Sequence, residues 1–403
     1  MTKTIASLLP IFLLVFSVVA GYFIHQESQF TNERHFVQLA EAFIKNDLFL
    51  SPFGLPNGDY ADYFGKQYLF FGPMPSLLLV PFVLIFGYEF PQMFLSVVSI
   101  FVTYVTVYLL CKRFKFNRVD SLWLANFFLF GSVLYFVSVV NISAYVVQAV
   151  VTPFVMLSLY EYFGKKRWAL LGMFTAAAIL TRVTLVGMAV FFMIELVRTT
   201  KKPELIKSSV LFLLPILVCV SLLGLYNFRR FNSPFNTGYT LNVTAVHNVG
   251  GNHEAGFFSP VHIPGNLYAL LFMGPGMVNK TTYPFLAQFP YLKANGWGLA
   301  IWYTSPLLVY LIKARLKGVV LSAVGGILII AAPSLLYYGI GMSQYGYRYS
   351  LDFFPLLFLI LLTTFKEKLP TLAKIIILVG VLFNLFYMLS IWNAYPLFFW
   401  LNG

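Results

Sequence analysis

Apolar stretches long enough to cross a bilayer alternate with short polar breaks along almost the whole chain. A helix needs about 20 apolar residues to cross a hydrocarbon layer of about 30 Å. The pattern therefore predicts an all-α polytopic membrane protein with about 11 transmembrane helices. The predicted crossing segments are residues 4–24, 91–111, 119–140, 143–162, 167–184, 185–198, 208–228, 298–312, 318–340, 351–365 and 371–391.

One further apolar segment, residues 69–87, does not fit this alternation. It is interrupted by Pro73, Pro75 and Pro81, and proline removes a helical hydrogen bond and bends or ends a helix. A full crossing here would also move every later basic break to the other side of the membrane. We therefore predict a proline-broken interfacial or re-entrant segment, with a full crossing as the alternative.

Composition supports the membrane assignment. Of the 403 residues, 59% are hydrophobic and only 10% are charged, whereas soluble domains carry about 25% charged residues. The first apolar run, 4–24, is long and lacks a small-residue cleavage site, so we expect a retained span and not a signal peptide. With no internal repeat and no separate soluble module, residues 1–403 are predicted to form one integral domain.

The charge distribution predicts an orientation. The net charge is +13, but the basic residues gather in short breaks, whereas all five histidines lie in or beside the remaining breaks. Clustered Lys and Arg mark cytoplasmic loops, so the surplus indicates topology and not nucleic-acid binding. We expect a cytoplasmic N-terminus and an inner (plasma) membrane location. The basic breaks are CKRFKFNR (111–118), GKKR (164–167), RTTKKPELIK (198–207), KARLK (313–317) and KEK (366–368).

Two predicted outer loops, residues 25–68 and 229–297, are long enough to carry a site. Within 32–50, apolar residues recur at helical spacing and polar residues fall on another face, which predicts an amphipathic helix on the outer membrane surface. The second loop is predicted to be an ordered, membrane-hugging lid. The helical pattern consists of apolar Phe36, Leu39, Ala40, Phe43 and Ile44, polar Gln38, Glu41 and Lys45, and Thr31 or Asn32 as N-cap.

Two charged positions near the predicted membrane stand out. Arg182 interrupts an apolar run, and such a residue is either functional or reaches water from a helix end. Arg348 and Asp352 are four residues apart, so on an α-helix they would share a face and pair. Tyr347 beside them belongs to a tyrosine-rich stretch that predicts ligand contact, the alternative being an anchored helix end.

The outer loops supply further candidates. Arg229 and Arg230 are placed to bind a lipid-linked phosphate or pyrophosphate, or else ordinary headgroups. The carboxylates of the first loop are candidates for a general base, the alternative being inert, solvated acids; they are Glu27, Glu33, Asp59 and Asp62. No cysteine or histidine spacing predicts a metal site, although a divalent cation stays open as a cofactor.

Several stretches resemble a known family. NERHFVQLA (32–40) and GKQYLFFGPMPSLL (65–78) are similar to the first outer loop of C-type (GT-C) glycosyltransferases, family 39, the protein mannosyltransferase and lipid A aminoarabinose transferase type. LYNFRRFNSPFNTGY (225–239), NGWGLAIWYTSPLLVYL (295–311) and QYGYRYSLDFFPLL (344–357) resemble a bacterial subgroup of that family.

The resemblance implies transfer of a sugar from a polyprenyl-phosphate donor to a glycan, lipid or protein acceptor on the extracytoplasmic face, with inversion. The family's leading aspartate corresponds to Asn32, and an amide cannot accept a proton. The base would then be Asp59, which we slightly prefer, or Glu33. Residue types and topology, assisted by this analogy, predict the substrate-binding residues Arg182, Arg229, Arg230, Arg348, Asp352, Tyr347, Tyr68, Lys66 and His35.

Other classes of function stay open at this point. A transporter or flippase of lipid-linked glycans would also carry intramembrane arginines, but internal repeats would be expected. An O-antigen ligase or polymerase would share the lipid-linked substrate. A non-catalytic binding protein would explain Asn32.

Overall fold

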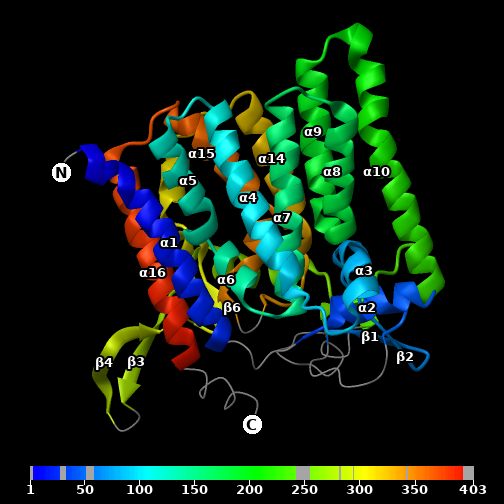
Figure 1. The fold of residues 1–403 in the computed structure, drawn as a ribbon, viewed down its shortest axis with the longest axis horizontal. Helices are drawn as coiled ribbons and strands as arrows, with labels where there is room; N and C mark the ends of the chain where they lie inside the picture. Colours follow the sequence, from blue (N-terminus) through cyan, green and yellow to red (C-terminus); the bar gives the residue numbers. More distant parts are fainter. Residues whose placement is uncertain are drawn as a thin grey trace.

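The computed structural model describes residues 3–27, 33–50, 59–241, 255–280, 283–293, 295–341 and 344–393. The fold is mostly helical, and its long helices lie side by side (Figure 1). The α-helices are α1 (Lys3–Glu27), α2 (His35–Ile44), α3 (Met74–Phe86), α4 (Met93–Arg113), α5 (Arg118–Phe130), α6 (Leu134–Val139), α7 (Ser143–Tyr162), α8 (Trp168–Thr181), α9 (Val186–Thr199), α10 (Lys202–Phe231), α12 (Ile263–Leu271), α13 (Ile301–Thr304), α14 (Val319–Leu336), α15 (Phe354–Phe365) and α16 (Thr371–Asn393).

Short strands and 3₁₀-helices occur between the long helices. The strands form three two-stranded sheets, of which β1–β2 and β3–β4 are antiparallel and β5–β6 is parallel. The elements are β1 (Ala61–Tyr63), β2 (Lys66–Tyr68), β3 (Gly276–Lys280), β4 (Tyr283–Lys293), β5 (Trp297–Leu299), β6 (Gln344–Gly346), η1 (Val183–Leu185), η2 (Tyr239–Leu241), η4 (Pro260–His262), η5 (Pro306–Lys313) and η6 (Arg348–Asp352).

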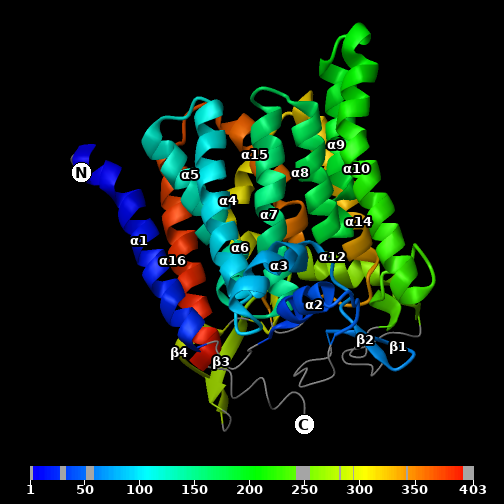
Figure 2. The same ribbon diagram turned by 45° about the vertical axis from the view of Figure 1, so that its right-hand side comes forward.

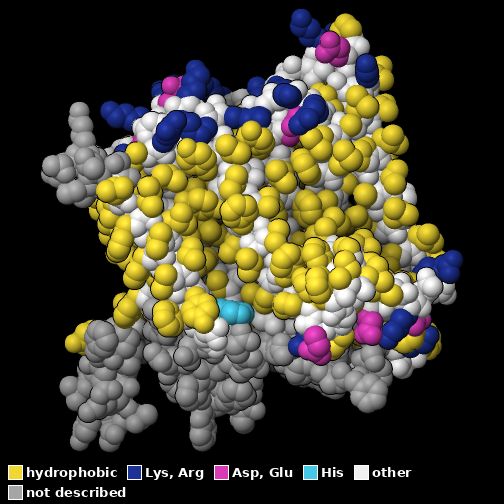
Figure 3. Space-filling view, viewed as in Figure 1, with side chains coloured by type: hydrophobic (Ala, Val, Ile, Leu, Met, Phe, Trp, Pro, Cys, Tyr) yellow, Lys and Arg dark blue, Asp and Glu magenta, His cyan; other side chains and the backbone are white. Residues whose placement is uncertain are grey.

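The helices are those of a membrane-embedded protein. Among the described residues, six helices are long and apolar enough to cross a bilayer, namely α1, α4, α7, α10, α14 and α16. Hydrophobic side chains form a belt around the face seen in Figure 3, and Lys and Arg side chains gather along one edge of it. We call this edge the basic end; it includes Lys112 and Arg113 at the end of α4 and Arg198 in the last turn of α9. The opposite, hairpin end carries α2, α3 and β1–β2 (Figures 1 and 2).

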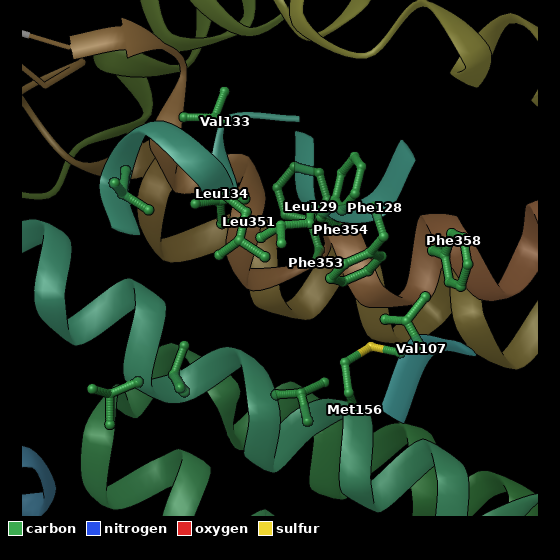
Figure 4. Close-up of a cluster of buried hydrophobic side chains, with 14 of the residues drawn as sticks. Val107, Phe128, Leu129, Val133, Leu134, Met156, Leu351, Phe353, Phe354 and Phe358 are labelled. Atoms are coloured by element: carbon green, nitrogen blue, oxygen red, sulfur yellow. The ribbon is translucent and has the colours of Figure 1, made fainter. Parts of the chain in front are cut away.

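Aromatic side chains fill the centre of the helix bundle. Phe128 of α5 lies against Phe354 and Phe358 of α15, with ring centroids 5.3 and 5.0 Å apart. Val107 of α4 and Met156 of α7 are fully buried nearby (Figure 4). Inside a membrane the hydrophobic effect does not drive helix association. Close contacts between large rings therefore hold these helices together.

A buried amide fixes α16 against the rest of the bundle. The Asn384 side chain donates to the carbonyls of Phe130 and Thr304, both at 2.9 Å, and accepts a hydrogen bond of 2.7 Å from the Tyr345 hydroxyl. Because an unpaired amide would be costly in an apolar interior, these bonds define the position of α16 along its axis.

The helix predicted within residues 32–50 is present as α2. The candidate caps Thr31 and Asn32 lie outside the described residues, and the N-cap position is taken by Arg34, whose side chain makes no capping bond. The expected polar face is wrong at Gln38, whose side chain is buried because α2 packs along α3.

Residues 69–87 contain the short helix α3. Pro73 and Pro75 occupy its start, where a missing N–H costs nothing. With 13 residues, α3 is about 20 Å long, which is less than the hydrocarbon thickness. It lies beside α2 at the hairpin end (Figures 1 and 2).

The predicted break at Arg182 is confirmed. Helix α8 ends at Thr181, Arg182 adopts an extended conformation with φ −145°, and η1 leads into α9. The chain therefore turns at the hairpin end and places the Arg182 side chain among the segments that lie there. Within the predicted loop 229–297, residues 255–293 include α12 and the β3–β4 pair, whereas 242–254 lie outside the described residues.

Candidate functional site

A cavity of about 360 Å³ lies at the hairpin end. Gly72 in the cavity lining packs directly against the end of α8. A side chain could not be accommodated there, because a Cβ atom would stand 2.1 Å from the Leu180 carbonyl oxygen. The cavity has a charged part and an apolar part. The charged lining residues are Asp59, Arg182, Arg230 and Arg348, and the apolar ones include Val183, Val186, Leu223 and Pro333.

Arg182 is held by a buried, two-point ion pair. Its Nε lies 2.7 Å from Asp352 Oδ1, and its Nη2 donates to Asp352 Oδ2 at 2.9 Å. The Thr184 hydroxyl adds a bond of 2.7 Å to the same carboxylate. Only 11% of the Arg182 side chain is exposed, so it does not extend to water from the helix end. The pair fixes the guanidinium at the cavity wall.

The predicted pair between Arg348 and Asp352 is wrong. Residues 348–352 form the 3₁₀-helix η6, which has three residues per turn, so residues four apart do not share a face. Arg348 instead stacks near the rings of Tyr145 and Tyr349, at 5.4 and 5.0 Å from their centroids. Among the described residues, no carboxylate lies within ion-pair distance of Arg348, so its positive charge is available to an anion in the cavity.

Arg229 and Arg230 are adjacent but have different environments. Arg230 is 4% exposed, donates to the Leu69 carbonyl at 2.6 Å and to Asn227 Oδ1 at 2.7 Å, and stacks on Tyr226. It lines the cavity, and within the part of the chain that the structure describes it has no carboxylate partner. Arg229 is exposed and does not line the cavity.

Asp59 is the carboxylate of the first loop that lines the cavity. It lies deep in the protein but retains exposed surface. Burial raises its pKa from 3.8 to about 6, and the nearby Glu33 raises it as well, while His35 and Arg348 oppose the shift. A carboxylate with such a pKa is a stronger base than an ordinary aspartate and is still mostly ionised at neutral pH.

Glu33 has a different environment. Its Oε2 accepts a hydrogen bond of 2.6 Å from the backbone N–H of Ser143, at the start of α7. His35 Nδ1 lies 2.9 Å from Ser143 Oγ and 3.4 Å from the Glu33 carboxylate. Both side chains are about 1% exposed. A carboxylate is stabilised at a helix N-terminus, so Glu33 anchors α2 to α7 and does not line the cavity.

The negative charge of Glu33 is therefore expected to raise the pKa of Asp59 without direct contact with the cavity. Replacing Glu33 by glutamine removes a negative charge that raises the pKa of Asp59, so we expect that pKa to fall toward its ordinary value. Glutamine retains an acceptor for the Ser143 N–H, which preserves the fold. Carbon-13 NMR of aspartate-labelled protein measures the shift. The same substitution at Glu41, which pairs with exposed Lys45, should leave it unchanged. An Asp59 titration that did not respond to Glu33→Gln would contradict this coupling.

Tyrosines form one wall of the cavity. Tyr239, Tyr337 and Tyr349 line it, and burial raises the pKa of Tyr239 to about 12, so its hydroxyl remains a donor. Tyr347, in contrast, is buried and donates a bond of 3.0 Å to Asn266 Oδ1. Tyr347 therefore does not line the cavity but supports the tyrosine wall on the side that faces the protein interior.

The remaining predicted residues lie away from the cavity lining. The Tyr68 ring packs on Phe231 at 5.3 Å, and the Lys66 ammonium lies 4.5 Å from the centroid of the Phe49 ring, both in the β1–β2 hairpin. The structure thus brings Asp59, Arg182, Arg230 and Arg348 together and leaves Lys66, Tyr68 and Arg229 outside.

Several residues of this site were not selected from the sequence. Tyr239 closes the stretch 225–239 that contains the Arg229–Arg230 pair, so its proximity in the sequence to those arginines could have indicated it. Ser143 and Asn266 are ordinary polar residues in the sequence, and only the three-dimensional contacts reveal their roles.

No group of three or more His, Cys, Asp or Glu side chains in the described ranges is arranged to hold a metal ion. Positive charge in the cavity comes from its arginines. Comparison with protein-family models, with curated proteins and with solved structures finds no match for this chain.

Proposed function

We propose that this protein is a membrane glycosyltransferase that uses a polyprenyl-phosphate-linked sugar as donor. The observation that carries the proposal is the composition of one cavity. It combines a carboxylate with a raised pKa, two arginines, Arg230 and Arg348, that have no carboxylate partner within the described ranges, and an apolar side that includes the half-exposed Val183 and Val186.

Each part of such a donor has a matching chemical environment. The phosphate would bind Arg348 and Arg230, since guanidinium groups form charge-assisted bonds with phosphate oxygens. The polyprenyl chain would lie along Val183, Val186 and Leu223, and the sugar would face the tyrosine wall.

The reaction would be a single displacement with inversion. The Asp59 carboxylate takes the proton of an acceptor hydroxyl as its oxygen forms a bond to the anomeric carbon of the sugar. The bond between that carbon and the phosphate oxygen breaks, and polyprenyl phosphate leaves against the arginines. This assignment places Asp59 as base and gives Glu33 a structural and electrostatic role.

The proposed membrane arrangement follows the positive-inside rule. The basic end would face the cytoplasm together with the N-terminus, and the cavity would open on the extracytoplasmic side of the inner membrane. About 11 helical passes, with α3 as an interfacial segment, would account for the alternation of basic and acidic breaks. A GT-C-like bundle is consistent with this arrangement.

Matched arginine variants test the proposal. Purified protein in lipid nanodiscs would be supplied with a panel of radiolabelled polyprenyl-phosphate sugars and a membrane extract as acceptor. Arg348→Gln should raise the KM for the donor about 10- to 100-fold, because a hydrogen bond to a charged group contributes about 1.5–3 kcal/mol. Arg229→Gln, which removes an exposed charge outside the cavity, should change KM less than about twofold.

The same assay separates the alternatives. Donor binding without release of its sugar would contradict the transferase proposal and favour a transporter or flippase. Transfer of a whole glycan from a pyrophosphate-linked donor would favour a ligase or polymerase. Equal losses in Arg348→Gln and Arg229→Gln would contradict the assignment of the phosphate to the cavity.

A further inference from the structure

The β1–β2 hairpin has an aromatic residue in a turn position that disfavours it. Its two-residue loop, Phe64–Gly65, joins the paired residues Tyr63 and Lys66. Both loop residues have positive φ, 51° for Phe64 and 72° for Gly65, which is the pattern of a type I′ turn. Asn–Gly is strongly preferred there, and a bulky side chain at positive φ is unusual. A strained residue whose ring is also largely exposed points to a role outside the hairpin.

The Phe64 ring contacts the ring of the adjacent Tyr63, with 4.5 Å between their centroids, and is otherwise almost fully exposed. Phe64 is 88% exposed and Phe235 is 92% exposed, the two highest values for large hydrophobic side chains in the described part of the chain. Both lie in segments that pack on the outer end of α10. Tyr68 of the hairpin contacts Phe231, and a Cβ atom on Gly238 would meet both Phe231 and Ala61.

The adjoining surface of α10 indicates what covers these rings. Helix α10 is the least buried of the six candidate membrane helices, with 17% of its apolar window buried. Its exposed apolar side includes Leu225 and Phe228, at 53% and 49%, and continues past the helix end to Phe235. Figure 1 shows the β1–β2 hairpin near this end of α10, just below α2. An apolar surface that is continuous with a lipid-facing helix is covered by lipid.

Basic residues accompany the exposed rings. Arg229 is exposed at the end of α10, and Lys66 follows the hairpin turn. Aromatic rings with neighbouring Lys or Arg are typical of the membrane–water interface, where rings lie among the headgroups and cations meet lipid phosphates.

We propose that Phe64 and Phe235 insert into the outer lipid interface and form a membrane anchor for the β1–β2 hairpin. Asp59 lies just before β1, and Phe70–Pro73 line the cavity just after β2. The anchor therefore fixes the hairpin at the bilayer surface. The two chain segments that leave the hairpin and line the cavity are positioned with it. The anchoring is a matter of position and does not depend on the reaction that occurs in the cavity.

Spin-label accessibility tests the proposal directly. In a Cys111→Ser, Cys219→Ser background, a nitroxide is attached to Phe64→Cys or Phe235→Cys, and the protein is reconstituted into phosphatidylethanolamine–phosphatidylglycerol vesicles. Power saturation then compares collisions with oxygen, which concentrates in lipid, and with a water-soluble nickel chelate. The anchor predicts that oxygen dominates at both positions.

Two reference labels define the scale. Leu217→Cys on the exposed side of α10 gives the lipid value, and Lys45→Cys at the end of α2 gives the water value. Labels at 64 and 235 that behaved like the one at 45 would overturn the proposal and favour a surface for a soluble partner.

A second measurement does not need labels. Phe64→Asn places a favoured residue in the turn, so we expect a higher melting temperature in detergent. In vesicles the gain should shrink or reverse, because the lipid contact is lost. A lower melting temperature in detergent would show that Phe64 is held by protein contacts and would contradict the anchor.

Discussion

Asp59→Asn is expected to slow sugar transfer by about 100- to 10,000-fold, the range typical for loss of a general base. Asparagine is nearly isosteric and cannot accept the acceptor's proton. Donor binding should change much less than the rate, since the phosphate would be held by Arg348 and Arg230, which asparagine at position 59 leaves in place. Single-turnover transfer, measured together with equilibrium donor binding, separates the two effects.

The pH dependence provides an internal check on the same prediction. The pKa of Asp59 is raised to about 6, so the basic form is lost as the pH falls below that value. Wild-type transfer should therefore rise with pH through about 6, and the residual rate of Asp59→Asn should not show this limb. Asp62→Asn, three residues away and exposed on strand β1, is the matched control and should keep it. If the rise of the transfer rate with pH through about 6 persisted in Asp59→Asn, the general base would be a different residue.

Arg182→Met should destabilise the folded protein by about 3–5 kcal/mol, the usual cost of removing one partner from a buried ion pair. Asp352 would keep the Thr184 hydroxyl but would remain 1% exposed without a cation. Chemical unfolding in one detergent measures the loss. Lys45→Met, which breaks the exposed Lys45–Glu41 pair, should cost less than about 1 kcal/mol.

A double variant separates stability from function at this pair. Arg182→Met with Asp352→Asn removes both charges, so most of the lost stability should return. Transfer activity should stay low, because the cavity that would hold the phosphate at Arg348 and Arg230 still lacks the positive charge of Arg182, which lines it as well. Full recovery of activity in the double variant would assign the pair a purely structural role.

The break at Arg182 was predictable because a charged residue inside an apolar run needs a special environment. Its partner was not predictable. Asp352 lies 170 residues away in the sequence, and the nearer Arg348 has the helical spacing that favours a pair. The choice depends on a local property, the 3₁₀ geometry of η6, which the sequence RYSLD (348–352) does not reveal.

The different roles of the carboxylates Glu33 and Asp59 were also not predictable from the sequence. Glu33 and Asp59 belong to one loop, and the position of Asp59 in the aromatic run beside the proline segment gave it only a slight preference. The distinction comes from α7, whose first N–H group at Ser143 binds Glu33 across 110 residues. Arg229 and Arg230 are also separated by structure, since successive helical residues point about 100° apart, and only one of them points to the cavity.

The hydrogen bonds of Asn266 couple the movement of the tyrosine wall to that of helix α12. The Asn266 amide donates to the carbonyls of Leu335 and Tyr337 and accepts from Tyr347, and the backbone of Phe258 pairs with that of Tyr337. Helix α12 and the tyrosine wall are therefore one cooperative unit. Local opening of the wall must also release α12, so amide hydrogens in both segments would share a single exchange rate, and any molecule that lodges against the tyrosines would slow exchange in α12 as well.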